Sequence, residues 1–239
     1  MRILLTGGSG FLGMHLLSIL AHHQVLSFSR GKAGFSYQNV SYHNCNLSDT
    51  ATWKKQVRDF CPDIAIHLAW TGLPDYSFSR CLENFNFSID LVDVLASTGC
   101  KTIFMAGTCW EYGDIFGKVK ETDIPGPLRL FPSFKTGLRL VSQSIAKKYE
   151  VKLIWGRIFF VYGFGQRETS LIPTCYKAIK KGLYPEIKNP FSRHDFIHIS
   201  DVVGAIKALI ETPEVSGVFN LGSGIPNSVS QVYEHIARK

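Results

Sequence analysis

Three glycines near the N-terminus have the residue type and the spacing for binding a phosphate group. Gly7, Gly10 and Gly13 stand in the segment T-G-G-S-G-F-L-G, between an apolar run and an amphipathic stretch. In a strand-turn-helix unit the first glycine permits a tight turn, the second lets the backbone approach a pyrophosphate, and the third allows close helix packing. The backbone N–H groups of Phe11 and Leu12 would then face the anion at the start of the helix. The pattern predicts a Rossmann-type dinucleotide site.

A second indication concerns the identity of the dinucleotide. Rossmann domains that bind NAD have an acidic residue after the second strand, which accepts hydrogen bonds from the ribose 2′-hydroxyl. Here the region reads Ser27-Phe28-Ser29-Arg30 and contains neither Asp nor Glu. Arg30, together with Ser29 and Lys32, has the chemistry to bind a 2′-phosphate. We therefore predict NADP as the cofactor, with NAD as the alternative.

The chain that must position these residues alternates between strand-like and helix-like stretches. Strands are expected at residues 3–6, 24–29, 63–69, 102–106, 152–155 and 218–221. Helices are expected at residues 11–22, 50–60, 83–97, 132–149, 170–182, 200–212 and 228–238. Such alternation is typical of an α/β fold with a doubly wound parallel sheet of Rossmann type. We assign residues 1–162 to an NAD(P)-binding Rossmann domain. Residues 163–239 are assigned to a small C-terminal substrate-binding lobe, interleaved with the last strands of the sheet.

Composition narrows the class of protein. The chain has 239 residues, 45% of them hydrophobic, and a formal net charge of +7, which favours anionic ligands. The basic residues are scattered, so we do not expect nucleic acid as a partner. The six cysteines have no C-x-x-C or Cys/His spacing, so we expect reduced thiols and no metal site. With no signal peptide and no membrane span expected, a cytoplasmic location is predicted.

The glycine spacing of three and three resembles the extended short-chain dehydrogenase/reductase family, to which nucleotide-sugar epimerases, dehydratases and 4-keto reductases belong. Similar motifs extend over most of the chain. They are Asn46-Leu47-Ser48-Asp49 (the family's D-L-x-D), P-D-I-A-I-H-L-A ending at Leu68 and Ala69, Asn84 on a helix, W-G-R-I-F-F-V-Y-G with Phe160 at a usual Asn, R-H-D-F-I-H-I-S-D from Arg193, and N-L-G-S-G from Asn220. The resemblance implies cofactor contacts from Asn46, Leu47, Leu68, Ala69 and Asn84.

The resemblance also implies a catalytic set. Thr108 precedes Tyr112-Gly113 as in the family's S/T-x-x-x-Y-G, which implies that its hydroxyl polarises a substrate carbonyl. Lys135 matches the lysine of Y-x-x-x-K, which holds the nicotinamide ribose and lowers the pKa of the tyrosine. The tyrosine position itself is occupied by Phe131, which has no proton to transfer. General acid–base catalysis is worth about 10²–10⁴-fold, so we expect impaired turnover with the fold intact.

Three explanations for Phe131 stay open at this point. It is an engineered substitution, a natural change that makes the chain an impaired enzyme or a binding protein, or a change for which another group compensates. The candidates for compensation are Tyr112, Tyr162 and Cys109, none of which has helical spacing to Lys135.

The substrate is expected to be a nucleotide-diphosphate sugar. Sugar 4,6-dehydratases of the family have an Asp-Glu pair after the active-site Thr, whereas this chain has Cys109-Trp110. We therefore predict an NADP-dependent reductase of a nucleotide-linked 4-keto-6-deoxy sugar. The alternatives are an NAD-dependent nucleotide-sugar 4-epimerase and a non-catalytic nucleotide-binding protein.

Substrate contacts are predicted from Thr108, Cys109, Trp110, Phe160 and Arg193, the last of which would bind the diphosphate with its guanidinium fork. The chain stops about one helix after N-L-G-S-G, where the family continues, so the lobe is expected to be truncated. The resemblance further implies a homodimer that pairs through helices.

Overall fold

The computed structural model describes residues 1–31, 36–114, 117–126, 128–185 and 187–238. Its main sheet is built from β1 Arg2–Thr6, β2 Gln24–Ser29, β3 Val40–Asn44, β4 Ile64–His67, β5 Thr102–Thr108, β6 Lys152–Ile158 and β9 Gly217–Leu221. All seven strands are parallel, in the order β3-β2-β1-β4-β5-β6-β9. The predicted α/β, Rossmann-type, doubly wound fold is confirmed.

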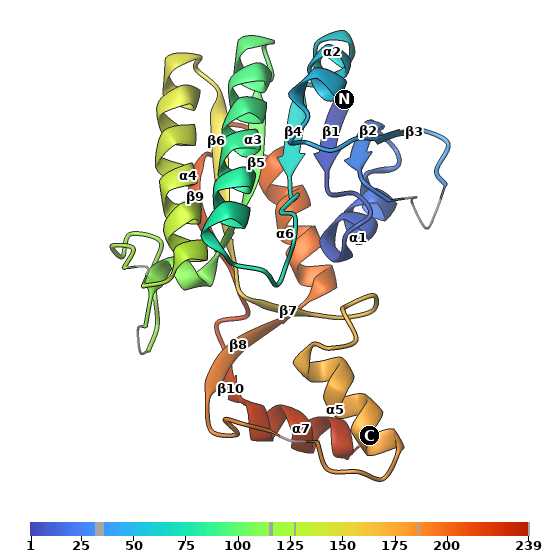
Figure 1. Cartoon of the computed structure of the whole chain (residues 1–239), viewed down its shortest axis with the longest axis vertical. Helices are drawn as coiled ribbons and strands as arrows, with labels where there is room; N and C mark the ends of the chain where they lie inside the picture. The colour runs from blue at the N-terminus through green and yellow to red at the C-terminus, as the bar shows by residue number, and fades with distance from the viewer. Residues whose placement is uncertain (32–35, 115–116, 127, 186, 239) are drawn as a thin grey trace.

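Five helices cover the two faces of this sheet. They are α1 Phe11–Leu20, α2 Thr50–Phe60, α3 Phe78–Ser97, α4 Leu130–Lys148 and α6 Ile199–Glu211 (Figure 1). One apolar cluster joins the sheet to α2, α3 and α4, and includes Trp53, Phe87 and Leu138. A second cluster joins the opposite face to α1 and α6, with Leu16 and Val202 among its members. Because successive strand residues point to opposite faces, Leu4 belongs to the first cluster while Ile3 and Leu5 belong to the second.

A smaller lobe lies beyond the carboxyl ends of the main strands (Figure 1). It contains the short sheet β10-β8-β7 and two helices, with bounds β7 Phe160–Tyr162, α5 Leu171–Lys180, β8 Arg193–His198, β10 Pro226–Ser228 and α7 Val229–Ala237. Within residues 163–239, α6 and β9 return to the main sheet, while α5, β8, β10 and α7 stay in the lobe. Ligands of open parallel sheets bind at the carboxyl ends of the strands, which is the side that the lobe faces.

Some elements differ from the sequence expectation. Strands β3, β8 and β10 were not predicted because they are polar and lie at the sheet edge or in the lobe, and β7 was not predicted because it is only three residues long. Helix α3 begins at Phe78 and not at residue 83, and its first turn has local ion pairs of Arg80 with Asp75 and Glu83. No helix in the described part of the chain combines the length and apolar character that a membrane span needs.

Candidate active site

The glycine turn forms a cradle in which side chains have no room. Gly7 has φ +80°, in the left-handed region that favours glycine, and its carbonyl accepts the N–H of Gly10 at 2.9 Å. A Cβ on Gly13 would lie 2.2 Å from the carbonyl oxygen of Gly7, so α1 packs directly on the turn. A Cβ on Gly8 would lie 2.0 Å from Ser27 Oγ, a constraint that sequence reasoning missed. No side chain caps α1 at Gly10, which leaves the helix N-terminus available to an anion.

A cleft of about 970 Å³ opens over this turn, at the carboxyl ends of the strands. It brings together most residues predicted to bind the cofactor, namely Gly7, Gly10, Phe11, Leu12, Gly13, Ser29, Arg30, Leu47, Leu68 and Ala69. The loop after β7 adds Gln166 and Arg167 to the opposite wall, which no motif had indicated. The cleft therefore lies between the glycine turn and the lobe.

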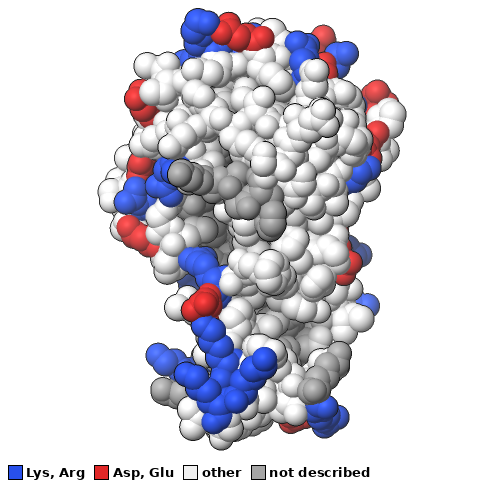
Figure 2. All heavy atoms as spheres, turned by 90° about the vertical axis from the view of Figure 1, so that its right-hand side faces the viewer, with Lys and Arg blue, Asp and Glu red and all other residues white. Residues whose placement is uncertain are grey.

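The chemistry of the cleft fits a large polar ligand such as a dinucleotide. Three buried polar atoms of residues that line it have no hydrogen-bond partner in the described structure: Trp70 Nε1, Thr71 Oγ1 and Gln166 Oε1. Buried polar groups are normally paired, so their orphaned state favours a ligand that completes them. Figure 2 shows Lys and Arg side chains gathered at the lobe end of the molecule, where α5 carries Lys177 and Lys180. This positive end favours anionic ligands.

The end of the cleft beyond β2 contains the predicted phosphate-binding arginine. Arg30 is exposed and lines the cleft, while Ser29 Oγ donates to the carbonyl of Gly31 at 2.9 Å. Lys32 lies outside the described residues. Leu47 and Cys45 form part of the wall, but Asn46 is exposed, does not line the cleft, and accepts the N–H of Ser48 through Oδ1. Of the N-L-S-D segment, it is thus Leu47 that faces the cleft.

Asn84 lies behind the wall of the cleft and hydrogen-bonds to the backbone of a residue in that wall. It is fully buried and does not line the cleft. Its Oδ1 accepts the N–H of Thr71 at 2.6 Å, and its Nδ2 donates to the carbonyls of Thr71 and Arg80. Asn84 thereby fixes the loop after β4, which supplies Trp70 and Thr71 to the wall.

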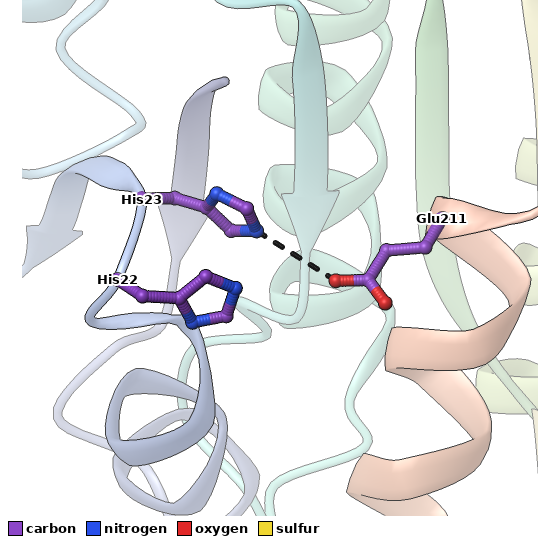
Figure 3. A group of neighbouring side chains, drawn as sticks. All are labelled: His22, His23 and Glu211. Carbon is purple, nitrogen blue, oxygen red and sulfur yellow. Dashed lines mark ion pairs between the residues drawn. The ribbon is translucent and has the colours of Figure 1, made fainter.

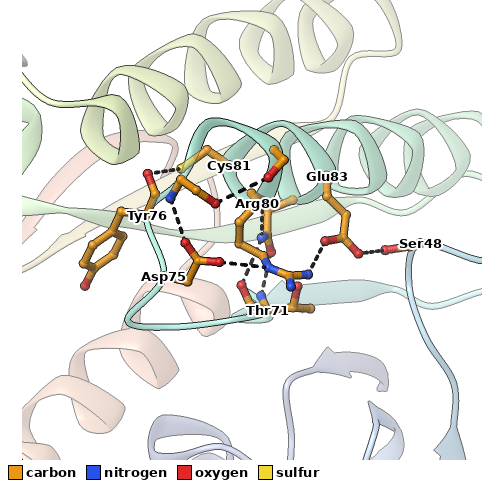
Figure 4. A network of polar contacts seen from close by, with 10 residues as sticks. Ser48, Thr71, Asp75, Tyr76, Arg80, Cys81 and Glu83 are labelled. Carbon is orange, nitrogen blue, oxygen red and sulfur yellow. Dashed lines mark hydrogen bonds and ion pairs between the residues drawn. The ribbon is translucent and has the colours of Figure 1, made fainter.

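The same loop is held by a polar network, shown in Figure 4. The guanidinium of Arg80 forms ion pairs with Asp75 and Glu83, and Ser48 Oγ donates to Glu83 at 2.7 Å. The Arg80 side chain also covers Gly72, where a Cβ would lie 2.5 Å from Arg80 Nε. The network links the loop after β3 to the first turn of α3, and so connects two walls of the cleft.

Lys135 is buried beside the cleft. Its Nζ donates to the carbonyl of Ala106 at 2.8 Å and lies 4.1 Å from the centre of the Trp70 ring. Burial lowers the pKa of Lys135 to about 7, against the attraction of the Glu111 carboxylate. A lysine whose pKa lies near neutrality and which adjoins a cleft is typical of a functional site.

Phe131 lies one helical turn before Lys135, inside a group of aromatic rings. Its ring centre lies 5.2 Å from that of Trp70, 5.0 Å from that of Tyr76 and 6.0 Å from that of Trp110. We call these four residues the aromatic cluster. It brings the loop after β4, the turn after β5 and the start of α4 together, so that Trp110 and Phe131 are neighbours.

Thr108 ends β5 and caps the short 3₁₀-helix η1 Cys109–Tyr112, with its Oγ1 accepting the N–H of Trp110 at 3.3 Å. The turn is anchored by Glu111, a fully buried carboxylate that sequence reasoning missed. Glu111 accepts hydrogen bonds from the N–H of Thr108, from Trp155 Nε1 and from Arg157 Nε. The position of Thr108 therefore depends on a buried ion pair.

The groups expected to compensate for Phe131 are poorly suited to proton transfer. The Tyr112 hydroxyl donates to Asn220 Oδ1 at 2.7 Å, and its ring stacks on Arg157. Burial raises the pKa of the Cys109 thiol to about 12. Tyr162 lies on β7 in the lobe sheet, with its ring against His198. Among the rings that the structure shows in contact with Phe131, Tyr76 is the one with a hydroxyl, and no motif had indicated it.

None of the five residues predicted to contact substrate is among those that line the cleft in the described structure. Thr108, Cys109 and Trp110 lie at the turn that ends β5, and the other two lie in the lobe sheet. Phe160 packs against His194 and Phe196 within the lobe sheet, while its neighbours Phe159 and Val161 line the cleft, because adjacent strand residues face opposite sides. Arg193 is exposed at the start of β8 and donates to the carbonyl of Pro226 at 2.8 Å.

Comparison with known proteins agrees with this geometry. The sequence model described as NAD dependent epimerase/dehydratase family matches residues 3–222. A dTDP-4-dehydro-6-deoxyglucose reductase from Escherichia coli is 28% identical over 99% of this chain and 81% of its own length. A dTDP-6-deoxy-L-talose 4-dehydrogenase (NAD(+)) from Aggregatibacter actinomycetemcomitans is 25% identical over 98% and 88%. The crystal structure of UDP-glucose 4-epimerase from Thermus thermophilus, complexed with NAD, has a TM-score of 0.88 at 21% identity and covers 100% of this chain and 83% of its own.

Proposed function

Because this chain belongs to the NAD-dependent epimerase/dehydratase family of enzymes, we propose that it is an NADP-dependent reductase of a nucleotide-linked 4-keto-6-deoxy sugar. The observation that carries the proposal is the cleft, which contains the glycine cradle and Arg30 and extends to Trp70, whose ring centre lies 4.1 Å from Lys135 Nζ. The similarity to a dTDP-4-dehydro-6-deoxyglucose reductase supports the reaction, and the lack of an acid after β2 supports NADP.

The residues of the cleft have distinct roles in this proposal. The N–H groups at the start of α1 bind the pyrophosphate, and Arg30 binds the 2′-phosphate. When bound, the reduced cofactor supplies the hydride. Lys135 holds the nicotinamide ribose and keeps it beside the aromatic cluster.

Thr108 polarises the C4 carbonyl of the substrate. Its Oγ1 already accepts the N–H of Trp110, so the hydroxyl proton is free to be donated to the ketone oxygen. Cys109 and Trp110, which follow it, replace the acid–base pair that water elimination requires. This favours reduction over dehydration.

The alkoxide formed at C4 needs a proton, and Phe131 has none. Tyr76 is the candidate donor in this proposal, because its ring adjoins that of Phe131 and carries a hydroxyl. Proton donation from the loop after β4 would be less well aligned with Lys135 than donation from α4, so turnover is expected to be slow.

The test restores the hydroxyl at position 131. Phe131→Tyr is assayed for NADPH oxidation with a panel of nucleotide-linked 4-keto-6-deoxy sugars, and the rate is expected to rise about 10²–10⁴-fold. Phe134→Tyr is the matched control, because Phe134 lies on the same helix but packs against Phe78 and Phe85. Tyr76→Phe should abolish the residual rate of the original chain. If Phe131→Tyr binds NADPH and gains no rate, the reductase proposal fails.

Two alternative functions, a 4-epimerase and a non-catalytic nucleotide-binding protein, can be distinguished from the reductase by experiment. A 4-epimerase would recycle its hydride and retain NAD through purification, and the structurally similar epimerase is described in complex with NAD. Absorbance of denatured, freshly purified protein detects such bound NAD. A non-catalytic nucleotide-binding protein would bind NADPH and show no turnover in any of the three variants.

The outer face of helices α3 and α4 is a candidate surface for assembly. Exposed apolar side chains lie on the packed pair α3 and α4, among them Phe78, Leu82, Leu140 and Val141. We propose that a second copy covers this face and forms a homodimer, which sedimentation velocity would detect.

The cytoplasmic location stays a proposal that fits the free thiols at Cys45, Cys61, Cys81, Cys100, Cys109 and Cys175.

A further inference from the structure

A group of three potential metal ligands lies at the edge of the main sheet opposite the cleft. His22 and His23 belong to the turn between α1 and β2, and Glu211 is the last residue of α6 (Figure 3). The two histidines precede β2, at the amino end of a parallel strand, whereas the cleft lies at the carboxyl ends. One ligand atom from each of the three side chains lies within 4.8 Å of the others.

The ligand atoms of the group face one another at short range, and one of them has no hydrogen bond in the described structure. His23 Nε2 is buried and has no hydrogen-bond partner in the described structure. It faces Glu211 Oε1 at 3.6 Å, which is longer than a hydrogen bond, and the ring centre of His22 lies 3.8 Å from that of His23. This contact is an ion pair when His23 is protonated, as Figure 3 marks it, and in the neutral ring Nε2 has no hydrogen bond in the described structure.

The carboxylate is already oriented toward this position. Lys207 forms an ion pair with Glu211 through Oε2, one helical turn earlier on α6, so Oε1 is left toward His23. The turn that carries the histidines and the end of α6 are held close by the packing of α1 on α6. The backbone therefore presents the three groups from two elements whose separation is fixed.

We propose that His22, His23 and Glu211 form a zinc site, with water as the fourth ligand. Two imidazole nitrogens and one carboxylate oxygen are a ligand set that Zn²⁺ accepts in tetrahedral geometry. With Zn–N and Zn–O bonds of about 2.0–2.1 Å, the ligand atoms of such a site lie roughly 3.3 Å apart. The atoms must therefore approach by at most about 1.5 Å, and the pair His23 Nε2 and Glu211 Oε1 already lies at 3.6 Å. Rotation of the exposed His22 and Glu211 side chains permits this approach.

The bound ion would cross-link the turn between α1 and β2 to the C-terminal end of α6. Because it lies away from the cleft, its binding should raise thermal stability while leaving cofactor affinity unchanged. The neighbouring ammonium of Lys207 opposes a second positive charge, so an affinity in the micromolar range is expected, about 8 kcal/mol of binding free energy at 1 μM.

The test is a calorimetric titration of ZnCl₂ into metal-free protein prepared without a histidine tag. One Zn²⁺ is expected per chain, with a rise in Tm that saturates with zinc concentration. His23→Gln and Glu211→Gln should each weaken the binding about tenfold or more and remove the rise in Tm. His235→Gln, which changes a histidine on α7 outside the group, is the matched control and should behave as the unaltered chain does.

Circular dichroism melting without zinc shows whether each variant folds, so loss of binding is separated from loss of structure. The proposal is overturned if His23→Gln and the unaltered chain bind Zn²⁺ equally, or if zinc leaves the Tm of the unaltered chain where it was. Binding of NADPH to the zinc-loaded and metal-free forms is the second measurement. A change in that affinity would refute a site that is independent of the cleft.

Discussion

Lys135 offers a quantitative test of the site, because folding places its ammonium group in surroundings that disfavour the charge. Burial lowers the pKa of Lys135 from an ordinary value of 10.5 to about 7, while Glu111 acts in the opposite direction. Between these pH values the unfolded chain holds a proton that the folded chain has released, so stability rises with pH. The free-energy cost of folding with a buried, charged Lys135 ammonium is therefore complete below about pH 7 and vanishes above pH 10.5.

The magnitude follows from the two pKa values. Their difference of about 3.5 corresponds to roughly 5 kcal/mol at 1.36 kcal/mol per pKa unit. We predict that Lys135→Met, which keeps a similar length and removes the charge, is more stable than the unaltered chain at pH 7 by up to about 4 kcal/mol. The lost hydrogen bond to the Ala106 carbonyl subtracts about 1 kcal/mol at every pH. The advantage of the variant should shrink by about 2 kcal/mol between pH 7 and pH 9.

Urea denaturation of both proteins over this pH range, without cofactor, measures the effect. Burial also raises the pKa of Cys45, Cys100 and Cys109, so their thiols ionise earlier in the unfolded chain and lower stability as the pH rises through 9. These contributions are common to both proteins and cancel in the difference. A stability difference that stays constant from pH 7 to pH 9 would refute a lowered pKa of Lys135 in the folded state.

Three further predictions concern the cradle, the buried ion pair and the cofactor. Gly13→Ala should destabilise the fold by about 1–3 kcal/mol and weaken NADPH binding, because its Cβ would lie 2.2 Å from the Gly7 carbonyl oxygen. Gly204→Ala, where a Cβ meets nothing within 4 Å, is the control in parallel thermal melts and should be neutral or slightly stabilising. Glu111→Gln should cost about 3–5 kcal/mol in urea denaturation, because it leaves the Arg157 guanidinium buried without its carboxylate; a cost under about 1 kcal/mol would contradict this. Arg30→Ala should raise the KM for NADPH about 10–100-fold with little change for NADH, and equal effects on both cofactors would argue against a 2′-phosphate site.

The sequence predicted the structure well wherever the conformation of a segment is set by residues close to it in the chain. The glycine turn could be read from spacing, because the positive φ of Gly7 and the close approach of Gly10 and Gly13 to its carbonyl arise within residues 7–13. The central strands and most helices could also be read, because a strand buried on both faces is an apolar run and a helix that covers a sheet repeats its apolar positions. Arg30 could be placed at the cleft because it directly follows β2.

Prediction was weaker where partners come from distant parts of the chain. Edge strand β3 contains polar, exposed residues and takes its strand form from pairing with β2. Phe160 was expected in the substrate pocket, yet the pairing of β7 with β8 turns its neighbours Phe159 and Val161 toward the cleft instead. Glu111 reads as an ordinary surface acid in sequence and is buried only because Trp155 and Arg157 lie beside it.

The sequence by itself predicted the Rossmann fold and a phosphate-binding turn at Gly7, Gly10 and Gly13, because these constraints act largely through the local backbone. The sequence also determined that the side chain at position 131, a phenylalanine, cannot donate a proton. Only the tertiary structure decided what surrounds that position, since Trp70 and Tyr76 reach Phe131 from the loop after β4 and Trp110 reaches it from the turn after β5. It likewise brought Glu211 to His22 and His23, because the packing of α6 against α1 joins two ends of the chain that no spacing rule connects.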